Sequence, residues 1–171
     1  MIRVLPIALL LSAPAAAAQG ILGSDAAACR ASEGPAIQVD VLGLKDRKGE
    51  LTLELYPDTE TDFLKPDKDL VAAEKTFRRI AVPTPPAGAV ALCMRVARPG
   101  RYALLLIHNR DGKAKFGIWS DGAGFPSNVK LGRARPKVEQ ALIDVGPGIT
   151  VTHIRLQYLR GLGGFGPVDP D

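Results

Sequence analysis

The sequence predicts an all-β protein, a single antiparallel β-sandwich of about seven strands. Several short stretches alternate between apolar and polar residues, which is the period of two that places one face of a strand in a core. The chain contains 18 glycines and 14 prolines, and turns rich in these residues separate the alternating stretches. At most one stretch suits a short helix, and this combination favours two packed antiparallel sheets.

The first 18 residues are typical of a signal peptide. Arg3 provides a positive charge, residues 4–11 form a short apolar run, and the small residues Ala16 and Ala18 precede a predicted cleavage site at Gln19. The run is shorter than the roughly 18 apolar residues of a membrane-spanning helix. We therefore predict a periplasmic or secreted protein that is not transmembrane after cleavage; an uncleaved anchor helix is the alternative.

The rest of the chain suits one domain. Residues 19–35 are predicted to be irregular, residues 36–160 to form the β-sandwich, and residues 161–171, which are rich in glycine and proline, to form a flexible tail. The net charge of +4 is too small to indicate nucleic-acid binding, and an exported protein would meet anionic envelope surfaces instead.

The first two strands are predicted at residues 37–41 and 51–55, where valine, isoleucine and leucine alternate with polar residues. The alternation of the first strand breaks at Leu42 and Gly43, so the strand is expected to bend or end there. The polar turn at residues 45–49 predicts that the two strands form a hairpin with a solvated, charged tip.

A long polar connection follows at residues 57–75. Asp67 is expected to cap a short helix within it. Residues 77–82 are predicted to form a third strand, and its Arg78 and Arg79 indicate the edge of a sheet, because charge there discourages pairing with other chains.

The two cysteines, Cys29 and Cys93, are predicted to form a disulfide, because an even number of cysteines in an exported chain usually pairs. Residues 90–96 alternate so that their large side chains face the core, whereas Cys93 lies on the other face beside small alanines. That face leaves room for a segment that carries Cys29. Two free thiols are an alternative, and a redox or metal role is another, although neither cysteine has a CxxC or CxxH neighbour.

The strand predicted at residues 101–107 is apolar on both faces, so it is expected to be central and covered on both sides. Tyr102 follows a Pro-Gly turn and resembles a tyrosine corner, whose hydroxyl bonds nearby backbone. Further strands are predicted at residues 138–145 and 149–159. The alternation slips within the last strand, and a bulge near residues 152–153 would reconcile its two halves.

Four of these segments together resemble a bacterial protein family. They read VLGLKDRKGELTLELY at residues 41–56, PGRYA at 99–103, HNRDG at 108–112 and GFPSN at 124–128. In combination they are similar to the exported domain-of-unknown-function family 2141, over roughly residues 37–156. The resemblance implies a small periplasmic or secreted β-sandwich of the immunoglobulin-like or transthyretin-like sort. It supplies no catalytic residues, because the family has no established activity.

Relatives in this family often carry an acidic loop after the histidine that is reminiscent of a calcium loop. In this chain the equivalent residues 109–115 contain one carboxylate, Asp111, whereas calcium takes six to eight oxygen ligands. Arg110, Lys113 and Lys115 would also repel a cation. We therefore predict no metal and no cofactor, and a calcium-binding module at this loop is an alternative.

His108 and Asp111 could act together as an acid–base pair at the end of the central strand. A hydrolase would also need a nucleophile, and the nearest serines, Ser120 and Ser127, lie in no GxSxG motif. We expect a structural histidine at the rim of the sandwich. A hydrolase that uses His108 and Asp111 is the alternative.

The loop after the central strand predicts a binding surface. It gathers aromatic residues in a chain with only 5% aromatics, and a basic run follows directly. The aromatics either cap the core or bind a peptide, glycan or lipid, and the basic run is either a solvated face or a site for anionic groups. The candidate binding residues are His108, Asp111, Phe116, Trp119, Phe125, Asn128, Lys130, Arg133 and Arg135.

The function favoured by these observations is a non-enzymatic binding or interaction module of the cell envelope. The expected partner is an envelope protein, a glycan or an anionic lipid, with no nucleic acid and no cofactor involved.

Overall fold

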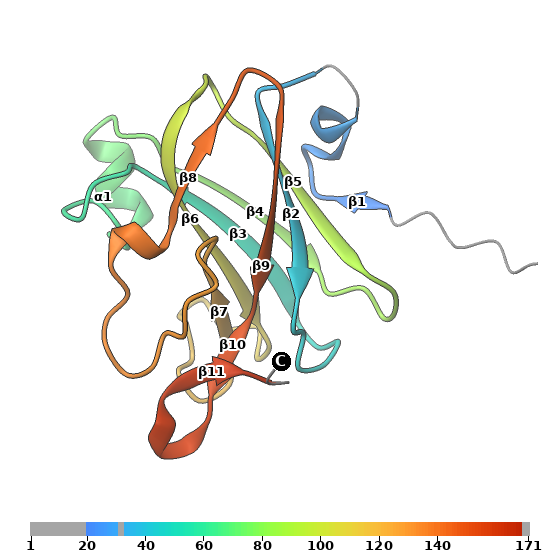
Figure 1. Ribbon diagram of the computed structural model, residues 1–171, viewed down its shortest axis with the longest axis vertical. Coiled ribbons are helices and arrows are strands. Elements are labelled where there is room, and N and C mark those ends of the chain that lie inside the picture. The colour runs from blue at the N-terminus through green and yellow to red at the C-terminus, as the bar shows by residue number, and fades with distance from the viewer. Residues whose placement is uncertain (1–19, 31–32, 169–171) are drawn as a thin grey trace, which may run out of the picture.

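The computed structural model describes residues 20–30 and 33–168 (Figure 1). This part of the chain is mostly β, with eleven strands in two sheets and one short α-helix. The predicted signal peptide lies outside the described residues. Within the described ranges, no helix has the length and apolar character that a membrane span requires.

The smaller sheet is mixed. From one edge to the other it contains β1 (Ile21–Leu22), β5 (Val90–Arg95), β2 (Ala36–Leu42) and β9 (Ile149–Arg155). Strands β2 and β5 are antiparallel, whereas β1 runs parallel to β5 and β9 runs parallel to β2. The prediction of a purely antiparallel fold is therefore wrong for this sheet.

The larger sheet has seven strands, all paired antiparallel. Its order is β11 (Phe165–Pro167), β10 (Gln157–Leu159), β7 (Gly122–Gly124), β6 (Gly100–Asn109), β3 (Glu50–Tyr56) and β4 (Arg78–Pro83). The seventh strand, β8 (Leu142–Val145), pairs with the first half of β6, on the same edge as β7.

The two sheets lie face to face (Figure 1) and share one hydrophobic core. Leu53 and Leu106 enter it from the larger sheet, and Val39 and Leu92 enter it from the smaller one. The two-sheet, mostly β architecture agrees with the sequence prediction. The number of strands is higher than about seven because short strands form at both ends of the described chain and within the loops.

Strands β2 and β3 belong to different sheets, so the predicted hairpin is wrong. Residues 43–49 cross from one sheet to the other, and Gly43, with φ +67°, adopts the left-handed conformation that glycine tolerates best. The alternation identified both strands because each has an apolar face toward the shared core. It could not identify their partners, since partners on either sheet produce the same pattern.

Strand β6 is central and covered on both faces, as predicted. Leu104 and Leu106 face the shared core, whereas Ala103 and Leu105 face a second cluster on the outer side of the larger sheet. The hydroxyl of Tyr102 donates to the carbonyl oxygen of Arg98 at 2.8 Å, which is the contact expected of a tyrosine corner.

The second cluster is covered by the predicted helix, α1 (Asp67–Ala72), whose Leu70 is buried. Pro66, not Asp67, occupies the N-cap position, and Asp67 lies in the first turn. Strand β4 is the edge of the larger sheet, as its two arginines indicated. One of them, Arg79, donates from Nε to the buried carboxylate of Glu54 at 2.6 Å.

The predicted disulfide is present between Cys29 and Cys93. It joins the short 3-10 helix η1 (Ala26–Cys29) to β5, where the two cysteines form a small buried cluster with Ala28 and Ala36. A separation of 64 residues corresponds to a stabilisation of about 4 kcal/mol in the chain-entropy estimate. A disulfide of this kind suggests an oxidising location outside the cytoplasm.

The last predicted strand divides into β9 and β10, which lie in different sheets. The register of β9 on β2 is unbroken, so the bulge predicted near residues 152–153 is wrong. The alternation slips because Thr150 and Thr152 occupy the positions opposite Ile37 and Val39. The chain leaves the smaller sheet at Leu156, whose N–H donates to the carbonyl oxygen of Leu42 at 2.9 Å.

Three other predicted segments also contain more structure than the sequence indicated. The described part of residues 19–35, predicted to be irregular, contains β1 and the 3-10 helix η1. Residues 138–145 begin with a 3-10 turn, η2 (Val138–Gln140), before β8. Within residues 161–171, where the sequence predicts a flexible tail, the 3-10 turn η3 (Gly161–Gly163) and β11 form a hairpin with β10.

Candidate functional site

His108 lies at the end of β6, and its side chain is 0% exposed. Its Nε2 donates to the carbonyl oxygen of Lys48 at 2.8 Å, because a carbonyl can only accept. In the neutral ring Nδ1 is then the acceptor, and the hydroxyl of Tyr158 donates to it at 2.7 Å. The Tyr158 oxygen in turn accepts the N–H of Lys45 at 3.1 Å. Both ring nitrogens therefore serve to hold the 43–49 crossover against β6 and β10.

The electrostatic environment keeps this group neutral. Burial lowers the pKa of His108, and burial raises the pKa of Tyr158 to about 12. Asp46 lies 4.0 Å from His108 Nε2, but its charge is engaged by Arg110, whose hydrogen bonds lower the pKa of Asp46 to about 2.

Arg110 and Asp121 fix the base of the loop that follows β6. Arg110 binds Asp46 through two guanidinium nitrogens and donates to the carbonyl oxygen of Ser120 at 2.6 Å. Asp121 is 1% exposed and accepts the N–H of Arg110 at 2.9 Å, the N–H of Gly117 at 2.7 Å and the hydroxyl of Ser120 at 3.0 Å. The two side chains clamp both ends of the 110–121 loop.

Asp111 is not brought to His108 by any contact among the described residues. Its carboxylate accepts the N–H of Lys113 at 3.0 Å and pairs with the ammonium of Lys113 at 3.1 Å. It also lies 3.1 Å from the hydroxyl oxygen of Ser120, whose single proton it shares with Asp121. The carboxylate oxygens of Asp111 therefore interact with other residues of the same loop. In the described part of the chain, no group of three or more His, Cys, Asp or Glu side chains is arranged to hold a metal ion.

The tip of the same loop is apolar and exposed. The N–H of Asp121 donates to the carbonyl oxygen of Gly117 at 2.8 Å, which closes a five-residue turn. Ile118 and Trp119 lie inside this turn and project outward, and Trp119 is 85% exposed. Because the turn is closed by backbone and by Asp121, the indole is presented on a fixed frame.

A second apolar tip lies on the hairpin between β10 and β11. Leu162, in η3, is 88% exposed. The hairpin is closed by the N–H of Arg160, which donates to the carbonyl oxygen of Gly164 at 2.8 Å. The guanidinium of Arg160 also donates to the carbonyl oxygens of Pro167 at 2.9 Å and Val168 at 2.7 Å.

The connection between β7 and β8 forms a third wall. Gly132 and Phe165 exchange backbone hydrogen bonds of 3.0 and 2.6 Å, an isolated bridge that ties this connection to β11. The buried amide of Gln157 accepts the N–H of Leu131 and donates to the carbonyl oxygen of Val129, both at 2.9 Å. The connection is therefore held by two separate sets of bonds.

The three walls enclose an open groove of about 680 Å³. Its lining is mainly apolar, and its principal side chains are Phe116, Ile118, Trp119, Leu131, Leu162 and Phe165. Of the eight large apolar residues that the described part of the chain exposes, four line this groove. Such clustering marks a binding surface more often than singly scattered apolar residues do.

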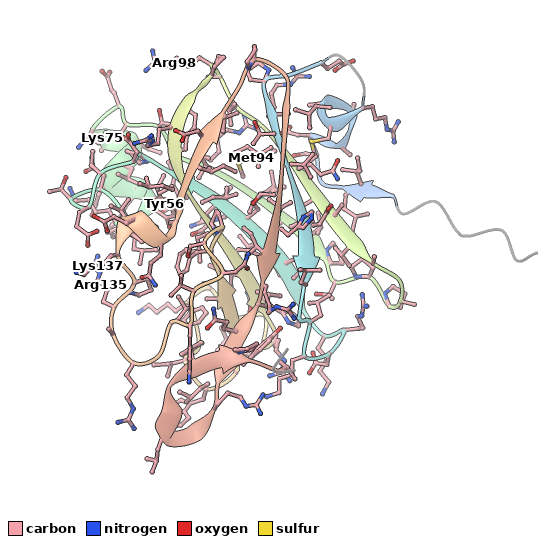
Figure 2. The ribbon with its side chains drawn as sticks, viewed as in Figure 1. Tyr56, Lys75, Met94, Arg98, Arg135 and Lys137 are labelled. Atoms are coloured by element: carbon pink, nitrogen blue, oxygen red, sulfur yellow. A yellow bond between two sulfur atoms is a disulfide. The ribbon has the colours of Figure 1, made fainter. Side chains whose placement is uncertain are left out.

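The charged residues at the groove are basic. Arg133 and Arg135 line it, and among the described lining residues none is acidic. Arg133 makes no hydrogen bond or ion pair with any described residue, and Arg135 donates only to the carbonyl oxygen of Phe63, at 3.4 Å. Figure 2 shows Arg135 beside Lys137 on the connection between β7 and β8.

The other predicted binding residues have different surroundings. Phe125 is buried in the second cluster, and its ring packs edge-on against that of Phe63, with 5.8 Å between the ring centroids. Asn128, with φ +55°, donates from Nδ2 to the carbonyl oxygen of His153 at 2.8 Å and accepts the N–H of Arg155 at 2.6 Å. These two side chains pack or hold a loop, whereas Lys130 is exposed next to the groove-lining segment.

The structure thus joins Phe116, Trp119, Arg133 and Arg135 at one groove. It also adds residues that sequence reasoning missed, namely Ile118, Leu131, Leu162 and Phe165. The signal that could have found the last two is the pair of large apolar residues inside an otherwise glycine-rich segment directly after a strand.

A second, polar cavity of about 360 Å³ shares Phe116 with the groove. Glu50 and Glu54 line it, together with Arg79. Glu54 accepts hydrogen bonds from Arg79 and from the hydroxyl of Tyr56, both at 2.6 Å, so its oxygens are satisfied by the sheet itself.

Comparisons with known proteins bear on the family and not on a ligand. Neither the curated proteins nor the solved structures contained a match. A family model described as an uncharacterized protein conserved in bacteria (DUF2141) matches residues 39–153. This range contains all four segments on which the resemblance rests, the whole of β6 and the 110–121 loop, so it confirms the resemblance seen in the sequence. The chain therefore belongs to the bacterial family DUF2141.

Proposed function

We propose that this protein is a non-enzymatic binding module of the bacterial cell envelope, periplasmic or secreted, and that the apolar groove holds its ligand. The disulfide and the predicted signal peptide support the location. The scaffold is proposed to be of the immunoglobulin-like or transthyretin-like sort, which the face-to-face sheets support, although the two parallel pairs depart from a purely antiparallel sandwich.

One observation carries the proposal. Trp119 and Leu162 lie on two turns that are closed by backbone hydrogen bonds at one groove, and they are 85% and 88% exposed. Covering a large apolar side chain contributes roughly 1.5–3 kcal/mol, and a turn whose backbone is already closed by hydrogen bonds needs little further ordering when it binds. The groove volume of about 680 Å³ also lies within the range of roughly 300–1,000 Å³ that is usual for small-molecule sites.

The surroundings of His108 favour a structural role over a catalytic one. A general base must reach the proton that it removes, within about 3.2 Å or through one water. The His108 ring is fully buried, both of its nitrogens are hydrogen-bonded, and Asp111 is engaged by Lys113 and Ser120. These contacts support the binding proposal over a hydrolase that uses this pair.

The proposal is tested with Nile red, a neutral apolar dye whose emission rises when it leaves water. We expect saturable binding that weakens at least about tenfold in Leu162→Asp, because a carboxylate at this position would meet the apolar ligand. Val71→Asp is the matched control, since Val71 is 62% exposed on α1 and lies outside the groove lining. Equal binding by both variants and the unchanged protein would refute the groove as the binding site.

A further inference from the structure

The groove combines an apolar lining with an unmatched positive charge. Elsewhere in the described chain, Arg79, Arg101 and Arg110 pair with carboxylates, whereas the guanidinium of Arg160 donates to backbone carbonyl oxygens. Arg133 and Arg135 have no carboxylate partner among the described residues, and the groove lining contains no described acidic residue. A neutral apolar ligand would leave the charge of both guanidinium groups uncompensated, although Arg135 donates to the carbonyl oxygen of Phe63, whereas an anionic ligand would complement both charges.

Resting on the function proposed above, we infer that the ligand is a single-chain amphiphile with an anionic headgroup. Its acyl chain lies along the groove between Trp119 and Leu162, and its carboxylate or phosphate binds Arg133 and Arg135. Arginine suits this role because its planar guanidinium donates two parallel hydrogen bonds to either anion.

A free amphiphile fits the groove better than the face of a lipid bilayer does. A bilayer would meet only the two exposed tips, Trp119 and Leu162, and would leave the inner lining at Leu131 and Phe165 uncovered. A single chain can enter between the walls and contact all of these side chains. The connection between β7 and β8 is joined to β11 by backbone bonds at Gly132, and the ring of Phe116 lies against that of Phe165, with 6.0 Å between the ring centroids. These contacts hold the walls in place without a ligand.

The chain provides its own reporter, because Trp119 is its only tryptophan. Its indole emission is expected to shift to the blue when an acyl chain covers it. The probes are dodecanoate, dodecan-1-ol and dodecylammonium at pH 7.5, each below its aggregation concentration. They share one chain length and differ in the charge of the headgroup.

Dodecanoate is expected to bind at least about tenfold more tightly than dodecan-1-ol, and dodecylammonium more weakly than either. In Arg133→Gln the affinity for dodecanoate should fall part of the way toward that for dodecan-1-ol, and in the double variant Arg133→Gln/Arg135→Gln the two affinities should be equal. The affinity for dodecan-1-ol should not change in either variant. Arg98→Gln is the matched control, because Arg98 is also exposed and lies away from the groove, at the top of the view in Figure 2. Added salt should weaken only the binding of dodecanoate.

The outcomes separate the inference from the proposed function. Equal affinities for dodecanoate and dodecan-1-ol, both reduced in Leu162→Asp, would overturn the anionic ligand and leave the binding groove standing. No emission change with any of the three probes, together with no Nile red binding, would overturn both. A shift only with phosphatidylglycerol vesicles, and not with free dodecanoate, would replace the amphiphile with a membrane surface and so overturn the inference.

Discussion

The base and the tip of the 110–121 loop differ in almost every physical respect. The base is polar, buried and fully hydrogen-bonded, with His108, Arg110 and Asp121 each joined to several partners. The tip is apolar and exposed, and its side chains lie over a groove. The comparison teaches that the residues whose chemistry suggests catalysis hold this loop in place, while residues that are normally buried provide the surface that is free to bind.

Within the 110–121 loop, the largest effect on stability is expected from Asp121→Ala, at the base. It removes the acceptor of three hydrogen bonds within a buried site, which should lower the free energy of unfolding by about 3 kcal/mol. Urea unfolding measures this change. Asp144→Ala is the control, because Asp144 is exposed and forms a surface pair with Arg101 that is worth at most about 1 kcal/mol. Similar losses in the two variants would contradict the structural role of the base.

A somewhat smaller effect is expected from Gly124→Ala in β7, which adjoins the groove floor. A Cβ at this position would lie 2.7 Å from the carbonyl oxygen of Arg155 and 2.7 Å from Cγ2 of Ile154. We expect a loss of about 1–3 kcal/mol in thermal or urea unfolding. Gly146→Ala provides the comparison, since a Cβ there meets no atom within 4 Å. Equal stability of Gly124→Ala and the unchanged protein would show that β7 and its neighbours shift to make room for the methyl group, and would contradict this prediction.

The pH dependence of stability should report on His108. Burial lowers its pKa in the folded state, so the unfolded chain binds more protons below pH 6.5. The free energy of unfolding should therefore fall as the pH drops from 6.5 toward the native pKa, by up to about 1.4 kcal/mol per pH unit. Asp46, with a pKa of about 2, contributes above its unfolded pKa and loses its contribution only in a more acidic window.

This dependence is measured by urea unfolding at intervals between pH 5 and pH 7. In His108→Gln the part of the slope due to the buried imidazole should vanish, while the neighbouring Asp46, Arg110 and Tyr158 remain. His153→Gln controls for the removal of an imidazole from the surface, since the His153 side chain is 61% exposed. An unchanged slope in His108→Gln would mean that the folded protein accommodates a charged imidazole.

The smallest effect on stability is expected at the tip. Trp119→Ala should change the free energy of unfolding by no more than about 0.5 kcal/mol, because the side chain is exposed and makes no hydrogen bond with any described residue. Phe63→Ala, which removes a buried aromatic of the second cluster, should cost about 3–5 kcal/mol in the same urea titration. A large loss in Trp119→Ala would mean that the tip supports the fold and would remove the distinction between the two regions.

The sequence was sufficient to locate most strands, because the alternation of apolar and polar residues requires only that one face of the strand is buried. It located the central β6, the edge strand β4, the short helix and the pairing of Cys29 with Cys93. It failed where the answer depends on which sheet a strand joins. Residues 43–49 and Leu156 each carry the chain between sheets, and a local pattern has no means of distinguishing such a crossing from a hairpin turn or a bulge.

The candidate site was predicted only in part, for a related reason. Phe116 and Trp119 were recognised as aromatics in a glycine-rich loop, but their groove is completed by Leu162 and Phe165, more than 40 positions away in the numbering. Phe125 looked equivalent to Trp119 in the sequence, yet it packs into the second cluster. Only the tertiary contacts decide which aromatic is covered.

The passage of one continuous segment through both sheets has a consequence for how the protein unfolds. Strand β9 closes an edge of the smaller sheet, and β10 begins after a single residue, Leu156, as part of the larger one. Because one residue links the two strands, neither sheet can separate from the other without displacing Leu156. The amide groups of both sheets should therefore lose their protection against hydrogen exchange together, in one cooperative unit. Because β10 also carries the hairpin that bears Leu162, a ligand in the groove should slow exchange as far away as β2.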